Sequence, residues 1–350
     1  MIFKEEQKTQ PIERSEVWEA FKRVKAGGKS PGVDGVTIEA VESNPRKYLY
    51  PVWNRLASGS YYPQAVRQAE IPKGDGTMRV LGIPTVTDRV AQMVIKRKLE
   101  RLADKHFSTN SFGYRPKISA HDAIERCRIN CLRYSWAIDL DIKGFFDNID
   151  HDLMMLAVKR FTNEECILMY VERWLKAPVR LLDGTLKESN GRGTPQGGVI
   201  SPLLANIFLH FAFDLWFGKH YPDNVFERYA DDIIIHCNRF KEANRILKAV
   251  GKRLEECKLS LNQSKTKIVY CYNNQKRQVP MKLVNKSFDK FRKTELRNVF
   301  RCLNFRLAKW VRNRYRRFRK RPKSYAYNWL VRVSKAFPCL FVHWEHGFLP

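Results

Sequence analysis

Two apolar stretches of this 350-residue chain are interrupted by aspartates in a regular way. In the first, Tyr229–Asp232 (YADD) separates Phe226–Arg228 from the β-branched run Ile233–Ile235. β-Branched and aromatic residues favour strands, and a short polar insertion between two such runs is typical of a turn. The pattern therefore predicts a hairpin whose turn carries Asp231 and Asp232.

The second stretch is Trp136–Asp147, in which Asp139 and Asp141 alternate with aliphatic residues. A period of two predicts a strand with both aspartates on one face and the aliphatic side chains on the other. Like charges raise each other's pKa, and a bound divalent cation relieves that repulsion. Asp141, Asp231 and Asp232 are therefore candidates for a site that holds two metal ions. The alternative, that they are solvated loop acids, is weaker for the two segments together than for either one.

Two further patterns predict helices. Thr85 followed by Asp88 forms a capping-box pattern, and the helix that it opens continues through Val90, Val94 and Leu102. The longest apolar stretch, residues 199–217, is interrupted by four residues that a membrane span would not favour: Pro202, Asn206, His210 and Asp214. We expect a buried helix there.

Seven sequence blocks occur in the order found in reverse transcriptases encoded by group II introns, and the chain resembles that family, with a remnant of its maturase domain. The blocks cover most of the first 270 or so residues, which makes the resemblance far more specific than any single motif. They are Lys29–Thr37, Ile71–Pro84, Ser111–Pro116, Asp141–Asp147, Gly193–Leu204, Tyr229–Asp232 and Leu261–Lys267.

The resemblance implies roles for the acidic residues. Asp141, Asp231 and Asp232 fall on the family's catalytic, metal-binding positions, and the backbone carbonyl of Ile142 is a further expected ligand. Asp139 does not fall on such a position and ranks second. The implied cofactor is Mg²⁺, as two ions, with Mn²⁺ as the alternative.

The resemblance also implies contacts with the incoming deoxynucleotide and the template. Phe146 would lie beneath the sugar and clash with a ribose 2′-hydroxyl, and Lys73 with Arg79 would hold the triphosphate. Gln196, Gly197 and Lys265 complete the expected substrate-binding set. From the residues alone, the alternatives are that Phe146 is a core aromatic, that the two cations are ordinary surface residues, and that the glycine segment is a surface turn.

The charge of the chain points to a nucleic-acid partner. There are 64 Lys and Arg against 36 Asp and Glu, a formal charge of +28 and a pI of about 9.9. Residues 301–323 contain many cations, no acid, and aromatic and aliphatic residues at helical spacing. We expect a basic RNA-binding helix, with a membrane surface as the weaker alternative. Its expected RNA contacts are Arg312, Arg314, Arg316, Arg317, Arg319 and Arg321.

The expected fold is α/β (α+β): right-hand polymerase fingers and palm with a small antiparallel palm sheet, followed by the basic helical tail. Residues 1–70 would be an N-terminal extension and the start of the fingers, and 71–272 the fingers and palm. Residues 273–290 would be a shortened junction that lacks the family's primer grip and thumb, and 291–350 the maturase remnant. No HNH endonuclease module is expected.

Two hypotheses for function follow. The first is an RNA-directed DNA polymerase that uses an RNA template, a DNA primer and dNTPs, and that also binds group II intron RNA and assists its splicing. The second is a catalytically weak or inactive maturase that acts only as an RNA-binding protein, because the primer grip and thumb are missing. A third, an RNA-templated RNA polymerase, is weakened by Phe146.

The cysteines and the N-terminus indicate the compartment. Eight cysteines without paired CxxC spacing predict reduced thiols and no structural zinc. The charged start of the chain predicts no signal peptide, and no membrane partner is expected. We therefore expect the bacterial cytoplasm or nucleoid, with an organelle as the alternative. The sequence does not specify an oligomeric state.

Overall fold

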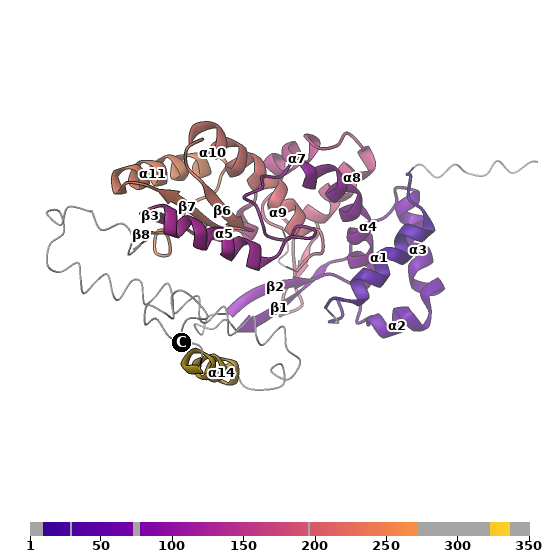
Figure 1. Ribbon diagram of the computed structural model, residues 1–350. Coiled ribbons are helices and arrows are strands. Elements are labelled where there is room, and N and C mark those ends of the chain that lie inside the picture. Colours follow the sequence, from indigo (N-terminus) through magenta and orange to yellow (C-terminus); the bar gives the residue numbers. More distant parts are fainter. Residues whose placement is uncertain (1–9, 29, 73–77, 195–196, 272–322, 337–350) are drawn as a thin grey trace, which may run out of the picture. The chain divides into compact units, whose positions relative to one another are not determined.

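The structure is a computed structural model of the whole chain and describes residues 10–28, 30–72, 78–194, 197–271 and 323–336. The chain divides into two compact units, residues 1–273 and 274–350. In the second unit the described element is one helix, α14 (Lys323–Ala336). All the other elements described below belong to the first unit (Figure 1).

The N-terminal part of the first unit is helical. Its helices are α1 (Arg14–Lys25), α2 (Ile38–Ser43), α3 (Pro45–Ala57) and α4 (Val86–Ala103). The apolar face of α1, which includes Val17 and Phe21, is buried in the same core as α4. Thr85 caps α4, because its hydroxyl accepts a hydrogen bond from the backbone N–H of Asp88. This confirms the helix start predicted from the sequence.

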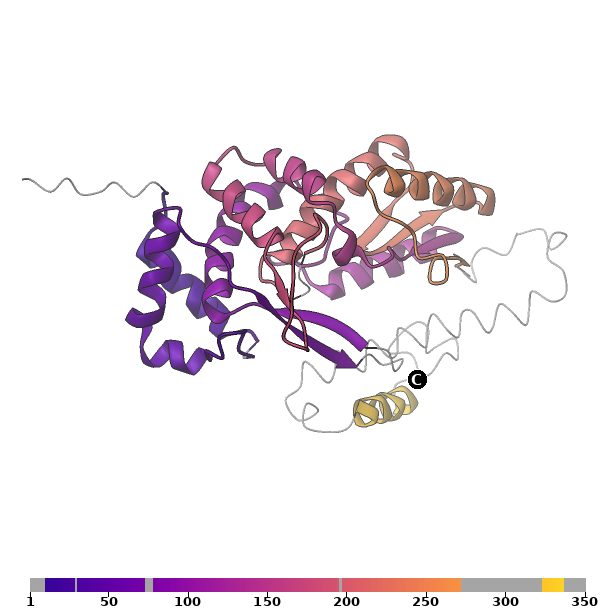
Figure 2. The same ribbon diagram turned by 180° about the vertical axis from the view of Figure 1, so that it is seen from behind.

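The first sheet has the strand order β2-β1-β4-β5. Its long hairpin is β1 (Val66–Pro72) and β2 (Met78–Ile83), and two short strands, β4 (Val179–Arg180) and β5 (Leu186–Lys187), extend it. The hairpin reaches away from the helices in both views (Figures 1 and 2). Its outer part therefore stays exposed, as the side chains of Ile71, Met78 and Val80 show.

The second sheet has the order β6-β7-β3-β8 and is antiparallel throughout. Its strands are β3 (Trp136–Leu140), β6 (Phe226–Tyr229), β7 (Asp232–Cys237) and β8 (Lys267–Tyr270). The apolar residues expected on one face of β3, Ile138 and Leu140, are buried, and Asp139 is exposed. This is the small antiparallel palm sheet that the sequence predicts.

Helices cover both faces of the palm sheet. The remaining helical elements are η1 (Asp104–His106), α5 (Ala120–Arg133), α6 (Phe145–Asn148), α7 (His151–Lys159), α8 (Glu165–Leu175), α9 (Ser201–Leu209), η2 (His210–Asp214), α10 (Leu215–His220) and α11 (Phe240–Glu256). Figures 1 and 2 show α10 and α11 on one side of the sheet and α5 on the other. On the first side Phe226 packs against Phe213 and Phe217, and on the second Glu227 bonds to Asn130 of α5.

The long apolar stretch forms the continuous helical segment α9–η2–α10, whose middle part is a π-helix. Its buried residues join one hydrophobic core that runs from the N-terminal helices to the palm sheet. The predicted buried helix is therefore confirmed. In the part of the chain that the structure describes, no helix combines the length and apolar character needed to cross a membrane. The basic segment 301–322 and the predicted junction 273–290 lie outside the described residues.

Candidate active site

The β6–β7 hairpin carries the two adjacent aspartates at its turn. Tyr229 pairs with Asp232, which leaves Ala230 and Asp231 as the two turn residues. Ala230 has φ 58°, a left-handed conformation that a two-residue hairpin turn can require but that a residue with a Cβ rarely adopts. Asp231 is half-buried and Asp232 is exposed. The predicted turn is thus present, at the point where the sheet ends.

Asp141 follows the last ladder pair between β3 and β7, Leu140 with Ile233. Extended by one residue, this register sets Asp141 across from Asp232, so the two acidic segments converge at one end of the palm sheet. Asp231 lies one residue away in the turn. Among the described residues, the three carboxylates do not form a closed group with oxygens within 4.8 Å of one another.

The segment after β3 is fixed by the loop before β8. The backbone N–H of Asn262 donates to the carbonyl of Asp141 (2.8 Å), and the N–H of Lys143 donates to the carbonyl of Ser260 (2.9 Å). These bonds flank the bridge between Ile142 and Leu261 and do not use the carbonyl of Ile142. The carbonyl oxygen of Ile142 therefore accepts neither of these two hydrogen bonds.

Lys265, one of the predicted substrate-binding residues, lies close to an aspartate of the site. Its Nζ is 3.8 Å from Oδ2 of Asp141, with side-chain exposures of 64% and 32%. Such an exposed ion pair contributes little, about 0–1 kcal/mol. The ammonium can therefore exchange Asp141 for another anion at small cost.

Phe146 lies in the short helix α6, after Gly144, whose φ of 52° starts the turn. The ring is 9% exposed and packs on Phe145 at 5.3 Å between centroids. Its carbonyl accepts a hydrogen bond from the N–H of Thr194 (2.8 Å). The glycine-rich block is thereby held against the Phe146 segment.

Gly197, in the same block, approaches the first sheet closely. Its φ is 124°, and a Cβ there would lie 2.4 Å from the carbonyl oxygen of Gly82 in β2. Only glycine fits such an approach. The next residues are held by α4, because the side-chain oxygen of Gln92 accepts a bond from the N–H of Val199 (2.8 Å). The block thus contacts both the fingers hairpin and α4.

Three predicted substrate-binding groups cannot be placed in this way. Lys73 and Gln196, together with the side chain of Arg79, lie outside the described residues. The backbone of Arg79 pairs with Ile71 near the outer end of the β1–β2 hairpin. The six arginines proposed to bind RNA, between Arg312 and Arg321, are likewise outside the described part of the chain.

A buried network behind the acidic turn is the feature that sequence reasoning missed. The guanidinium of Arg228, which is fully buried, makes a two-pronged ion pair with Asp214 (Nε to Oδ1 2.8 Å, Nη2 to Oδ2 2.6 Å). Its Nη1 also donates to Oδ1 of Asn206 (2.8 Å) and to the carbonyl of Ala230 (3.0 Å). One arginine therefore ties the turn to the helical segment beneath the sheet. The available signal in the sequence was that Asn206 and Asp214 interrupt the apolar run 199–217, which indicates buried polar partners.

The third predicted block supports the same turn from outside. The N–H of Phe112 donates to the carbonyl of Arg228 (2.8 Å), so the block runs beside β6. A Cβ on Gly113 would lie 2.4 Å from the backbone nitrogen of Ala230. The carbonyl of Gly113 accepts from the side-chain amide of Asn206 (2.7 Å). Contacts on both sides of the turn fix where Asp231 projects.

The donor set at this end of the sheet fits a hard divalent cation. Three carboxylates and a nearby carbonyl are the oxygen ligands that Mg²⁺ and Mn²⁺ prefer. No thiol or imidazole lies in this set. These oxygen donors are therefore of the kind that a hard divalent cation binds.

Comparisons with known proteins show the family of the chain. Residues 71–325 match the family described as "Reverse transcriptase (RNA-dependent DNA polymerase)". Protein YkfC of Escherichia coli is 31% identical over 280 residues, which are 69% of this chain and 73% of YkfC. The group II intron-encoded protein LtrA of Lactococcus lactis subsp. cremoris is 28% identical over 259 residues, or 72% of this chain and 41% of LtrA.

Other matches come from a mitochondrial intron protein and from solved structures. The putative COX1/OXI3 intron 1 protein of Saccharomyces cerevisiae is 33% identical over 54% of this chain and 22% of its own length. Telomerase from Candida albicans, solved with a fragment of telomeric RNA, superposes with a TM-score of 0.46 and 15% identity, covering 62% of this chain and 44% of that one. The chain thus spans less than half the length of LtrA and of the yeast intron protein. By its family match, the chain belongs to the reverse transcriptases (RNA-dependent DNA polymerases), and two of the relatives named above are intron-encoded proteins.

Proposed function

We propose that this protein is an RNA-directed DNA polymerase of a group II intron, which also binds the intron RNA and assists its splicing. The observation that carries the proposal is the β3–β7 register, which sets Asp141 across from Asp232, beside Asp231 in the turn. Its substrates would be an RNA template, a DNA primer and dNTPs. Its place of action would be the cytoplasm or nucleoid of a bacterium, with an organelle as the alternative.

Asp141, Asp231 and Asp232 would hold two Mg²⁺ ions, or Mn²⁺ in their place, with the carbonyl of Ile142 as a further ligand. When bound, such ions activate the attacking 3′-hydroxyl and neutralise the leaving pyrophosphate. The chain itself contributes the positions of the carboxylates. The turn that carries Asp231 is fixed by Arg228 from below and by Gly113 from outside, so the carboxylates need little reorganisation.

Two other residues would act on the nucleotide. Lys265 is exposed and only weakly paired with Asp141, so its ammonium would turn to a phosphate oxygen once cations occupy the carboxylates. Phe146, held by its bond to Thr194, would supply a rigid surface beneath the sugar that discriminates against a 2′-hydroxyl. Lys73, Arg79, Gln196 and Gly197 would complete the pocket for the triphosphate and template.

The test is primer extension. Purified protein with Mg²⁺ and primed poly-rA should incorporate dTTP, and Asp231→Ala should reduce incorporation to background. Asp223→Ala, an exposed aspartate in the preceding loop, is the matched control and should keep wild-type incorporation. Equal background incorporation by wild type and Asp231→Ala would reject the polymerase proposal.

The formal charge of +28 supports a second candidate, an RNA-binding maturase without polymerase activity. In that case wild type and Asp231→Ala would bind structured RNA equally, and neither would extend a primer. Binding should weaken steeply between low and moderate salt, because phosphate contacts release counterions. A flat salt dependence would show that the basic segment 301–323 does not contribute to RNA binding.

A further inference from the structure

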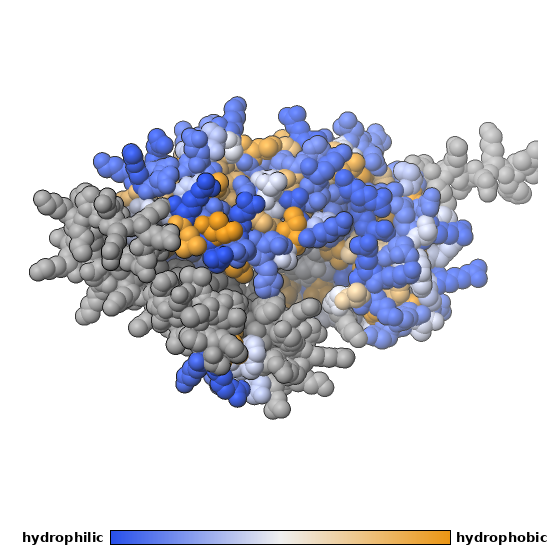
Figure 3. Space-filling view, in the orientation of Figure 1, coloured by the Kyte–Doolittle hydropathy of each residue, from blue (hydrophilic) through white to orange (hydrophobic). Residues whose placement is uncertain are grey.

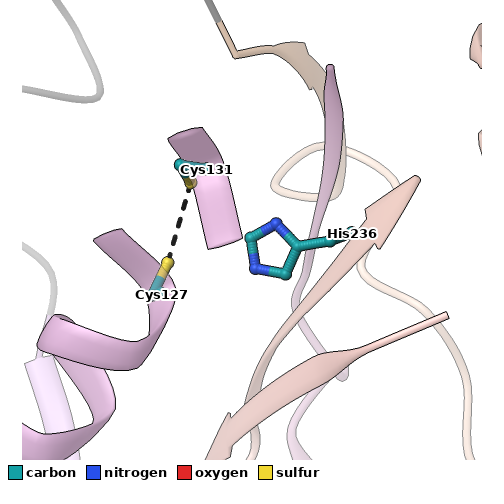
Figure 4. A group of neighbouring side chains, drawn as sticks. All are labelled: Cys127, Cys131 and His236. Atoms are coloured by element: carbon teal, nitrogen blue, oxygen red, sulfur yellow. Dashed lines mark hydrogen bonds between the residues drawn. The ribbon is translucent and has the colours of Figure 1, made fainter. Parts of the chain in front are cut away.

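A compact group of sulfur and nitrogen atoms lies on the α5 side of the palm sheet, apart from the aspartates. Cys127 and Cys131 are one helical turn apart on α5, and His236 is on β7. Their ligand atoms all lie within 4.8 Å of one another, and this is the only group of its kind among the residues that the structure describes. Figure 4 shows the imidazole of His236 facing the two thiols.

The spacing of the two sulfurs matches a tetrahedral metal site. Side chains at i and i+4 of a helix lie one above the other on the same face. The two Sγ atoms are 3.9 Å apart. Two thiolates at about 2.3 Å from a zinc ion with a tetrahedral angle lie about 3.8 Å apart. The sulfurs therefore need almost no movement to bind one ion together.

The imidazole is oriented as a metal ligand. His236 is 0% exposed, and its Nε2 lies 2.6 Å from Oε2 of Glu227. Its Nδ1 is buried and makes no hydrogen bond in this structure. The other oxygen of Glu227 accepts from the side-chain amide of Asn130 on α5 (2.5 Å). A carboxylate that fixes one ring nitrogen while the other faces thiols is the usual support of a metal-binding histidine.

A third thiol is available for a fourth position. Cys271 follows β8 directly, and its N–H donates to the carbonyl of Ser135, two residues beyond α5 (2.8 Å). This bond places the backbone of Cys271 beside the end of α5, while its Sγ lies outside the group whose ligand atoms are all within 4.8 Å of one another.

We propose that Cys127, Cys131 and His236 bind a structural Zn²⁺ ion, with Cys271 as its fourth ligand. A Cys₃His set with four protein ligands is typical of closed, structural zinc sites. The spacing of the cysteines along the sequence predicts no such site, because the ligands come from α5, β7 and the end of β8. These ligands become neighbours only in the folded chain, so no short sequence motif contains all of them.

The site would fasten α5 to the sheet. Only Ala123 and Asn130 of this helix are buried, while Ile124, Ile129 and Leu132 are at least 39% exposed. Figure 3 shows apolar side chains gathered over this region of the surface. A helix with so thin an apolar contact gains from a metal link, because metal binding free energy adds to folding free energy.

The zinc site is distinct from the proposed polymerase ions. His236 follows Asp232 by four residues on β7, a distance of about 13 Å at the usual rise of a strand. The ligands are soft thiolates and an imidazole, whereas the polymerase site offers oxygens. The two sites can therefore be removed one at a time.

The experiment measures zinc and cobalt in the full-length chain. Protein purified from zinc-supplemented cells without a metal-affinity tag should contain about one zinc per chain. Cys127→Ser and Cys131→Ser should each lower this at least fivefold. Cys166→Ser, a buried thiol of α8 far from the cluster in sequence, and Asp231→Ala should both keep the zinc.

Metal-free protein titrated with Co²⁺ provides a readout that does not depend on how much zinc is carried through purification. Thiolate-to-cobalt charge transfer and strong tetrahedral d–d absorption should appear in wild type and in Asp231→Ala. They should disappear in Cys127→Ser, with circular dichroism verifying that the variant is folded. Zinc below about a tenth per chain together with no thiolate absorption would overturn the proposal. An unchanged cobalt spectrum in Cys271→Ser would overturn the assignment of the fourth ligand.

Discussion

The two sheets of the first unit each contain an antiparallel hairpin at one edge, but the two hairpins have opposite surroundings. In the palm sheet Ile138, Ile233 and Ile235 are completely buried, and helices cover both faces. In the fingers hairpin Ile71 and Val80 are about half exposed. The palm hairpin ends in an acidic turn held by Arg228, whereas the outer ladder of the fingers hairpin ends at Pro72 and Met78.

Under the proposed function, the difference would separate two tasks. The palm turn would present carboxylates to cations within a fraction of an ångström and would need a rigid support, which burial with a hydrogen-bonded ion pair supplies. The fingers hairpin would close on a nucleotide and would benefit from few fixed contacts, since elements that move come from the less stable part of a structure. The following three predictions test whether the energetic contrast is as large as the structural one.

The largest effect is expected at the support of the palm turn. Arg228→Met should lower the free energy of unfolding by about 3–5 kcal/mol, because it leaves the carboxylate of Asp214 buried without its partner. Primer extension should fall with it, since the carbonyl of Ala230 loses a donor. Urea unfolding followed by tryptophan fluorescence measures the change.

Two variants control this prediction. Arg239→Met, an exposed arginine just before α11, should change stability by less than about 0.5 kcal/mol. Arg228→Met combined with Asp214→Leu should recover at least half of the lost stability, because no charge is then stranded. A loss below about 1 kcal/mol for Arg228→Met alone would show that the network does not support the turn.

A matched pair of isoleucines compares the two sheets directly. Ile233→Val in the palm should cost about 0.5–1.5 kcal/mol, because it leaves a small cavity in a close-packed core. Ile71→Val in the fingers, 49% exposed, should cost less than about 0.5 kcal/mol. Both changes keep β-branching and remove one methylene. Equal losses in urea unfolding would mean that the fingers hairpin is as tightly packed as the palm.

The smallest effect is expected at an ion pair on the palm's edge, between Asp150 at the start of α7 and Lys258 (2.7 Å). Burial raises the pKa of Asp150, but Lys258 and the N–H of Leu153 lower it by more, so the folded value lies below the ordinary one. The pair therefore stabilises the fold above about pH 4, and this contribution is lost as the pH falls through the depressed folded pKa.

Asp150→Asn keeps the helix cap but removes the charge. It should cost about 1 kcal/mol or less at pH 7, since Lys258 is half exposed. The difference from wild type should shrink between about pH 5 and pH 3. Unfolding measured across that range checks the sign. A difference that grows as the medium becomes acidic would contradict the assigned pKa direction.

Local patterns were sufficient for much of the fold. The β-branched run after Asp232 predicts its strand, the alternation around Asp139 predicts β3, and Thr85 predicts the start of α4, because each signal lies within a few neighbouring residues. The chemistry of two acidic segments suggested that Asp141 lies near the acidic turn, and the family's block order made that expectation specific. Periodicity alone cannot pair two strands that lie far apart along the chain.

The support of the site could not be predicted in the same way. Arg228 looks like an ordinary strand residue until Asp214 is placed beside it, and the sequence does not encode that pairing in any fixed spacing. Asn206 and Asp214 were visible as polar residues in an apolar run, which signals a buried partner without naming it. Cys127 and His236 likewise become neighbours only after the sheet has formed.

The positive φ of Ala230 explains why the acidic turn is so closely surrounded. An alanine in the left-handed region costs of order 1 kcal/mol, so the peptide on its own would abandon that shape. The tetrapeptide transplanted to another hairpin would therefore not carry its geometry with it. The conformation of this short motif is therefore determined by the residues that pack around it.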